Sequence, residues 1–86
     1  MATLVSMAVS AGAAWAHGVV KTSGTINGVF LTGSSKKTGK GAEITVCAYF
    51  NAATGAFLGE TETPDVSFAD EPALFDFCAA AAPIVQ

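Results

Sequence analysis

Apolar and polar side chains alternate most regularly between residues 42 and 50, with the period of two that is typical of a half-buried β-strand. One face of this strand carries Ile44, Val46, Ala48 and Phe50, and the other carries Glu43, Thr45, Cys47 and Tyr49. A short loop over residues 51–55 begins with Asn and ends with Gly, and residues 56–63 form the expected return strand. Pro64 ends that strand because proline cannot donate a hydrogen bond to the sheet. The pattern therefore predicts a hairpin over residues 42–63.

The flanking segments indicate further strands. We expect one near residues 25–32, an exposed and positively charged loop over residues 33–41, a short strand at 66–68 and a last strand at 73–79. Aromatic side chains concentrate in the second half of the chain and are expected to form the core: Phe50, Phe57, Phe68, Phe75 and Phe77. Four or five short strands separated by turns predict a mainly β fold, a small antiparallel β-sandwich or partly open barrel.

The N-terminal stretch differs from the rest because residues 2–16 are apolar, small and uncharged. This stretch is too short for a membrane-spanning helix, which needs about 20 residues. It ends in Ala14-Trp15-Ala16, which fits a signal-peptide cleavage site, but no basic side chain precedes it. We expect residues 1–17 to form an apolar arm or short helix, with a cleaved signal peptide as the alternative, and residues 18–86 to form a single small β domain.

The chain of 86 residues is short enough that its own core is marginal, so further stabilisation is expected. The two cysteines, Cys47 and Cys78, lie on predicted strands and could be neighbours across the sheet. A disulfide between them would contribute about 3–4 kcal/mol. The alternative is a pair of buried free thiols, which we expect of a protein assembled in the reducing cytosol.

Charges are segregated along the sequence. All four lysines, Lys21, Lys36, Lys37 and Lys40, precede position 43, whereas all seven acidic residues lie from Glu43 onward. Opposite charges of this kind either pair within one fold or pair between copies in a head-to-tail contact.

The residue types that carry most enzyme chemistry are scarce. The chain has no arginine and one histidine, so we expect no enzyme activity, no cofactor and no metal site. The net charge of −3 argues against binding nucleic acid, and nothing indicates a small-molecule substrate.

Two resemblances follow from these segments. The stretch from Ala42 to Thr63 resembles a strand–turn–strand of bacterial Ig-like extracellular domains. The Ala/Gly/Thr-rich composition, the N-terminal arm and the apolar end over residues 75–85 resemble the small head-decoration or cement proteins of tailed bacteriophages.

The phage resemblance implies a structural assembly protein at the virion surface that binds a protein shell or its own copies. The alternative is a secreted or cell-surface Ig-like binding module with a cleaved signal. The candidate interface residues are Leu4, Val5, Trp15, Lys36, Lys37, Lys40, Ile84 and Val85.

Overall fold

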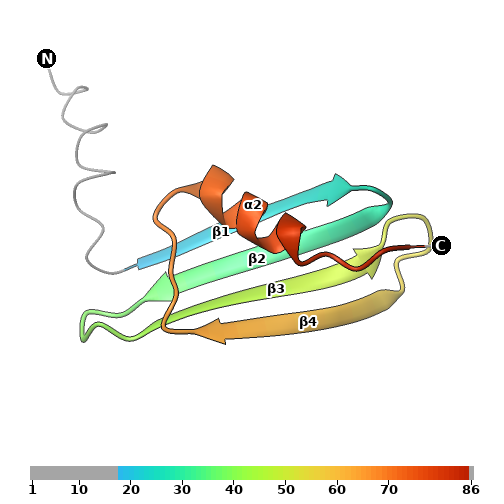
Figure 1. The fold of residues 1–86 in the computed structure, drawn as a ribbon. Coiled ribbons are helices and arrows are strands. Elements are labelled where there is room, and N and C mark those ends of the chain that lie inside the picture. Colours follow the sequence, from blue (N-terminus) through green and yellow to red (C-terminus); the bar gives the residue numbers. More distant parts are fainter. Residues whose placement is uncertain (1–17, 86) are drawn as a thin grey trace, which may run out of the picture.

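The computed structural model describes residues 18–85, which form one antiparallel sheet with a helix packed on it (Figure 1). The elements are β1 (Gly18–Ile26), β2 (Val29–Lys37), β3 (Glu43–Asn51), β4 (Phe57–Pro64) and α2 (Glu71–Ala80). The strands lie side by side in the order of the sequence, β1-β2-β3-β4. The fold is thus mainly β, as expected. The arm predicted for residues 1–17, with Leu4, Val5 and Trp15, lies outside the described residues.

Two predictions for the first hairpin, formed by β1 and β2, are wrong. The single strand expected over residues 25–32 is broken by a turn, at which Asn27 and Gly28 both have positive φ angles of 49° and 81°. Two such residues form the tight turn that matches the twist of a hairpin. The exposed loop expected over residues 33–41 is also wrong in its first half, because β2 continues to Lys37. Small, polar residues can occupy β2 because their backbones pair with strands on both sides.

The second hairpin is confirmed. β3 and β4 pair antiparallel, from Ile44 opposite Pro64 to Phe50 opposite Phe57, with an irregularity between Tyr49 and Phe50. Asn51 organises the connecting loop, because its side-chain oxygen accepts hydrogen bonds from the backbone N–H groups of Ala53 and Thr54, at 2.8 and 3.1 Å.

The last predicted strand is wrong: residues 71–80 form α2, and residues 66–68 form no strand. The helix begins where Asp70, Glu71 and Pro72 supply residues favoured at helix starts. Its first backbone bond runs from the Leu74 N–H to the Asp70 carbonyl, at 3.1 Å. Leu74 and Cys78 lie one helical turn apart and are both fully buried. A separation of four residues also puts two side chains on the same face of a strand, so this spacing is compatible with the strand predicted over residues 73–79.

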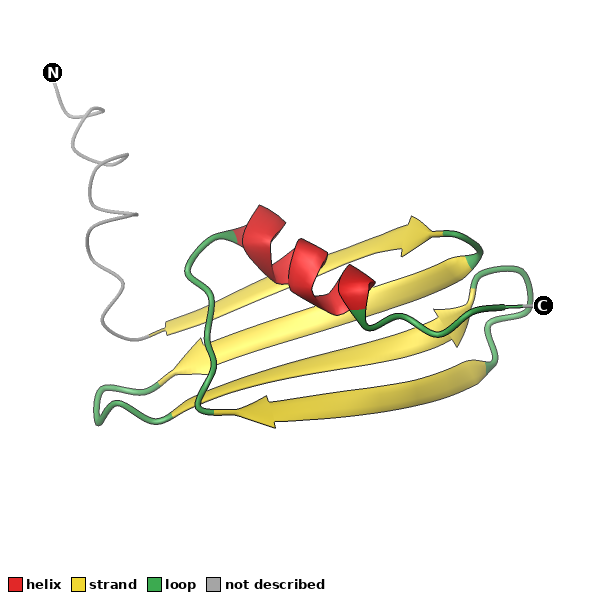
Figure 2. Ribbon diagram, in the orientation of Figure 1, coloured by secondary structure: helices red, strands yellow, loops and turns green. Residues whose placement is uncertain are grey.

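α2 packs across β1 and β2 on one face of the sheet (Figure 2). Glycine allows this close approach at two positions. A Cβ atom on Gly24 would lie 2.8 Å from Cε1 of Phe75, and one on Gly33 would lie 2.8 Å from Sγ of Cys78. The core consists of six fully or almost fully buried apolar residues: Val29, Leu31, Cys47, Tyr49, Leu74 and Cys78.

The predicted phenylalanine core is correct only in part. Phe68, Phe75 and Phe77 pack against the core, whereas Phe50 and Phe57 lie on the opposite face of the sheet. That difference follows from the placement of the helix, because the face it covers on β3 is the one with Thr45, Cys47 and Tyr49.

A disulfide joins Cys47 on β3 to Cys78 on α2, with a Cα–Cα distance of 5.6 Å. The two cysteines are therefore bonded and are not free thiols, and they connect helix to sheet rather than two strands. Beside the disulfide, the Tyr49 hydroxyl donates a hydrogen bond to the Cys78 carbonyl at 2.7 Å. Burial raises the pKa of the Tyr49 hydroxyl above its ordinary value of 10.0, and the Thr61 side chain lowers it by less.

Candidate interaction surface

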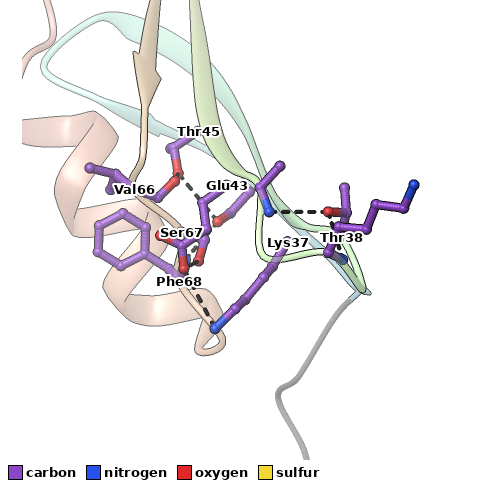
Figure 3. Close-up of polar contacts among 10 residues, drawn as sticks. Lys37, Thr38, Glu43, Thr45, Val66, Ser67 and Phe68 are labelled. Carbon is purple, nitrogen blue, oxygen red and sulfur yellow. Dashed lines mark hydrogen bonds and ion pairs between the residues drawn. The ribbon is translucent and has the colours of Figure 1, made fainter.

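One face of the sheet carries α2 and is called the covered face. On the other face no described helix or loop packs, and it is called the uncovered face. The segment after β4 closes the covered face near the start of β3 (Figure 3). There the Thr45 hydroxyl donates to the Val66 carbonyl at 2.8 Å, and the Phe68 N–H donates to Oγ of Ser35 at 2.6 Å. Among the described residues, no buried side-chain nitrogen or oxygen lacks a hydrogen-bond partner. The buried polar side chains of the covered face are thus all satisfied within the described part of the chain.

The uncovered face can be mapped from the strand register, because directly paired residues point to the same side of a sheet. Four rows cross it from β1 to β4: Val19-Lys36-Ile44-Pro64, Lys21-Ser34-Val46-Glu62, Ser23-Thr32-Ala48-Glu60 and Thr25-Phe30-Phe50-Phe57. No described helix or loop packs over these rows as α2 does over the other face.

One end of the uncovered face is an aromatic cluster of Phe30, Phe50 and Phe57. The Phe30 and Phe50 ring centroids are 6.4 Å apart, and those of Phe50 and Phe57 are 5.6 Å apart in an edge-on arrangement. Phe57 remains 62% exposed and Phe30 37% exposed. Neighbouring exposed aromatic rings mark sites at which proteins bind other proteins.

Charges flank the uncovered face with opposite signs on its two sides. Lys21 and Lys36 lie on β1 and β2, and Glu60 and Glu62 lie on β4. Lys21 and Glu62 share a row but stand three strands apart, roughly 14 Å at the usual strand spacing, and among the described residues they form no ion pair with each other. The salt bridge that the described residues do form, from Lys37 to Glu43 at 3.5 Å, lies on the side of the sheet that α2 covers.

The middle of the uncovered face is hollow. A depression of about 640 Å³ lies where the side chains are small, at Ser23, Thr32, Ser34 and Ala48, and it is bordered by Lys21 and Glu60. Its lining also includes Thr22, which is buried, and Glu71, but these two are hydrogen-bonded to each other at 2.8 Å, and the depression is open to solvent, unlike a typical small-molecule site. It has room for long side chains from another molecule.

The structure places the interface residues expected from the sequence in different parts of the molecule. Lys36 lies on the uncovered face, whereas Lys37 is paired with Glu43 and Lys40 sits in the exposed β2–β3 turn. Ile84 is 86% exposed, and Val85 packs against the core beside Gly28. The sequence reasoning missed Phe30, Phe57, Lys21, Glu60 and Glu62 as one surface. The signal that could have found it was the alternation of Ile44, Val46, Ala48 and Phe50, of which Phe50 was expected to lie in the core.

Two further classes of site are absent from residues 18–85. No group of three or more His, Cys, Asp or Glu side chains is placed to hold a metal ion. No helix of this part of the chain has the length and hydrophobicity needed to cross a bilayer.

Comparison of the chain with known protein families, curated proteins and solved structures found no match.

Proposed function

We propose that this protein is a structural, non-catalytic assembly module that binds another protein surface through the uncovered face of its sheet. The observation that carries the proposal is the aromatic cluster, exposed on a sheet face that nothing described in the chain covers. Burial of such a cluster is favourable at about 25 cal/mol per Å² of apolar surface. The flanking lysines and glutamates restrict which partner can dock and in which orientation.

The covered face supports this assignment by its contrast. Its side chains pack against α2 and form internal hydrogen bonds, so this face holds the fold together. The particular assembly we propose is the one implied by the phage resemblance: a decoration or cement subunit at the virion surface that assembles with a protein shell or with its own copies.

The test is site-specific photo-cross-linking in the cells that naturally produce the protein. A photoreactive phenylalanine analogue replaces Thr32, in the middle of the uncovered face, and in a matched variant it replaces the exposed Asp76 on α2. We expect a discrete cross-linked protein species from position 32 and none from position 76. Equal cross-linking at both positions, or none at position 32, would contradict the assignment of the face.

A second candidate function is supported by a different observation. The Cys47–Cys78 disulfide is typical of proteins that work in an oxidising compartment. It favours a secreted or cell-surface binding module, with residues 1–16 as its signal peptide. Intact mass of the native protein separates the two: a particle-bound chain that retains residues 1–16 fits the capsid subunit, and a shortened, oxidised chain free of particles fits the secreted module.

A further inference from the structure

The uncovered face is complementary to itself, and we propose that its partner is a second copy of this chain, packed face to face with a two-fold axis parallel to the strands. The proposal rests on the proposed function, since it names the partner of the same surface. It also goes further, because it specifies the orientation and the residue pairs.

The orientation follows from the order of the strands. A two-fold axis parallel to the strands reverses their order but keeps each row at its own height. β1 then lies over β4 of the other copy, and β2 lies over β3. In the row Lys21-Ser34-Val46-Glu62, Lys21 of each copy therefore faces Glu62 of the other. The Lys21–Glu62 contact that the single copy does not form is thus made twice in the pair.

The same two-fold axis also brings the aromatic clusters of the two copies together. In the row Thr25-Phe30-Phe50-Phe57, Phe30 of each copy faces Phe50 of the other, so the two clusters merge into one. Phe57 at the β4 edge is covered by β1 of the second copy. The row thereby supplies a desolvated centre of the kind that dominates binding energy.

The alternative face-to-face arrangement is unfavourable. A two-fold axis perpendicular to the strands keeps β4 over β4 and reverses the rows, so that Glu60 of each copy faces Glu62 of the other. Four carboxylates would gather at one edge and two lysine-bearing strands at the other. Charge repulsion thus excludes this arrangement and selects the parallel axis.

The dimensions of the face predict a weak dimer. Four strands at about 4.8 Å spacing and about 3.3 Å per residue present roughly 500 Å² per copy, and roughly 1,000 Å² in total is the lower limit for a specific interface. Aligned sheets pack about 10 Å apart. The depression over Ser23, Thr32, Ser34 and Ala48 gives the Lys21 and Glu62 side chains of the two copies room to meet. The two-layer β-sandwich predicted for one chain would then be formed by two.

The test is a charge-swap cycle on the oxidised, full-length protein, measured by analytical ultracentrifugation at low salt over about 1 µM to about 1 mM, the range expected for an interface of this size. Lys21→Glu and Glu62→Lys each place like charges opposite each other twice per dimer. We expect each single variant to weaken dimerisation roughly tenfold or more, and the double variant K21E/E62K to recover most of the wild-type affinity.

Two variants control for net charge. Lys40→Glu changes the charge as Lys21→Glu does, but in the β2–β3 turn, and Asp76→Lys matches Glu62→Lys on α2; both should dimerise like the wild type. A wild-type monomer at every concentration, or single variants that dimerise normally, would overturn the proposed pairing. So would a double variant that fails to recover. Cross-links from position 32 to a different protein, with a monomeric wild type, would overturn the self-pairing and leave the proposed function standing.

Discussion

The covered and uncovered faces of this sheet use the same four strands but opposite kinds of side chain. The covered face forms the interior, and beside the core residues Val29, Leu31, Cys47 and Tyr49 it carries small or polar residues: Thr22, Gly24, Gly33, Ser35 and Thr45. The uncovered face carries the aromatic cluster and four of the charged side chains.

The reason is steric. α2 brings its own apolar atoms, from Leu74, Phe75 and Cys78, and it needs small partners on the strands to approach closely. Hydrogen bonds then satisfy the polar groups that are buried, as Thr22 does by donating to a Glu71 carboxylate oxygen at 2.8 Å. The comparison teaches that the core side of a sheet is selected by what packs on it, and that apolar residues on the other side are then free to bind a partner.

Loss of the disulfide is the largest expected perturbation of the covered face. Cys47→Ala combined with Cys78→Ala removes a bond that spans a sequence separation of 31 residues, and should lower the free energy of unfolding by about 3–4 kcal/mol. Urea unfolding of the oxidised wild type and the double variant measures the difference. Added reductant should destabilise the wild type and leave the variant unchanged; equal stability of the two would show that α2 is held by packing alone.

A methyl group at Gly33 tests the steric argument directly. Gly33→Ala places a Cβ 2.8 Å from Sγ of Cys78 and 3.0 Å from Cγ2 of Thr22, so we expect a loss of about 1–3 kcal/mol in thermal or urea unfolding. Ser34→Ala, on the next residue and the uncovered face, is the matched control and should change stability by less than about 0.5 kcal/mol. If the two variants lost the same amount, the two faces would not differ in packing.

The smallest expected effect concerns the single tyrosine. Tyr49→Phe removes the hydrogen bond to the Cys78 carbonyl and should cost about 1 kcal/mol at neutral pH. Because burial raises the pKa of Tyr49 in the folded state, its contribution is complete below pH 10 and is lost as the pH rises above that value. The stability advantage of the wild type over the variant should therefore shrink in alkali. Since the chain has one tyrosine, tyrosinate absorbance follows this group alone; a titration midpoint at or below 10 would contradict the raised pKa.

The β3–β4 hairpin was predictable because its signals are local. Strict alternation in β3, Asn51 at the loop and Pro64 at the end of β4 all act within a few residues. The turn at Asn27 and Gly28 carried an equally local signal that the broader Gly/Thr pattern obscured. The helix was missed because Phe75 and Phe77 alternate over seven residues as in a strand, and because the residues that start it, Asp70 to Pro72, are also common in turns.

For the candidate surface, the sequence revealed the charge segregation but not the arrangement of the side chains on one face. The segregation of lysines before Glu43 and acids after it is visible in the sequence, and the strand order turns it into opposite charges on the two sides of one face. Among the expected interface residues Lys36 belongs to this surface, whereas the partnership of Lys37 with Glu43 depends on the pairing of β2 with β3.

The sequence by itself determined the β class, the second hairpin and the two sets of residues that face opposite ways on β3, because backbone pairing and a period of two are properties of short segments. Only the tertiary structure decided which set became the interior. That choice depended on α2 docking over Gly24 and Gly33 and on the bond from Cys47 to Cys78, contacts between residues up to 51 positions apart that no local pattern records.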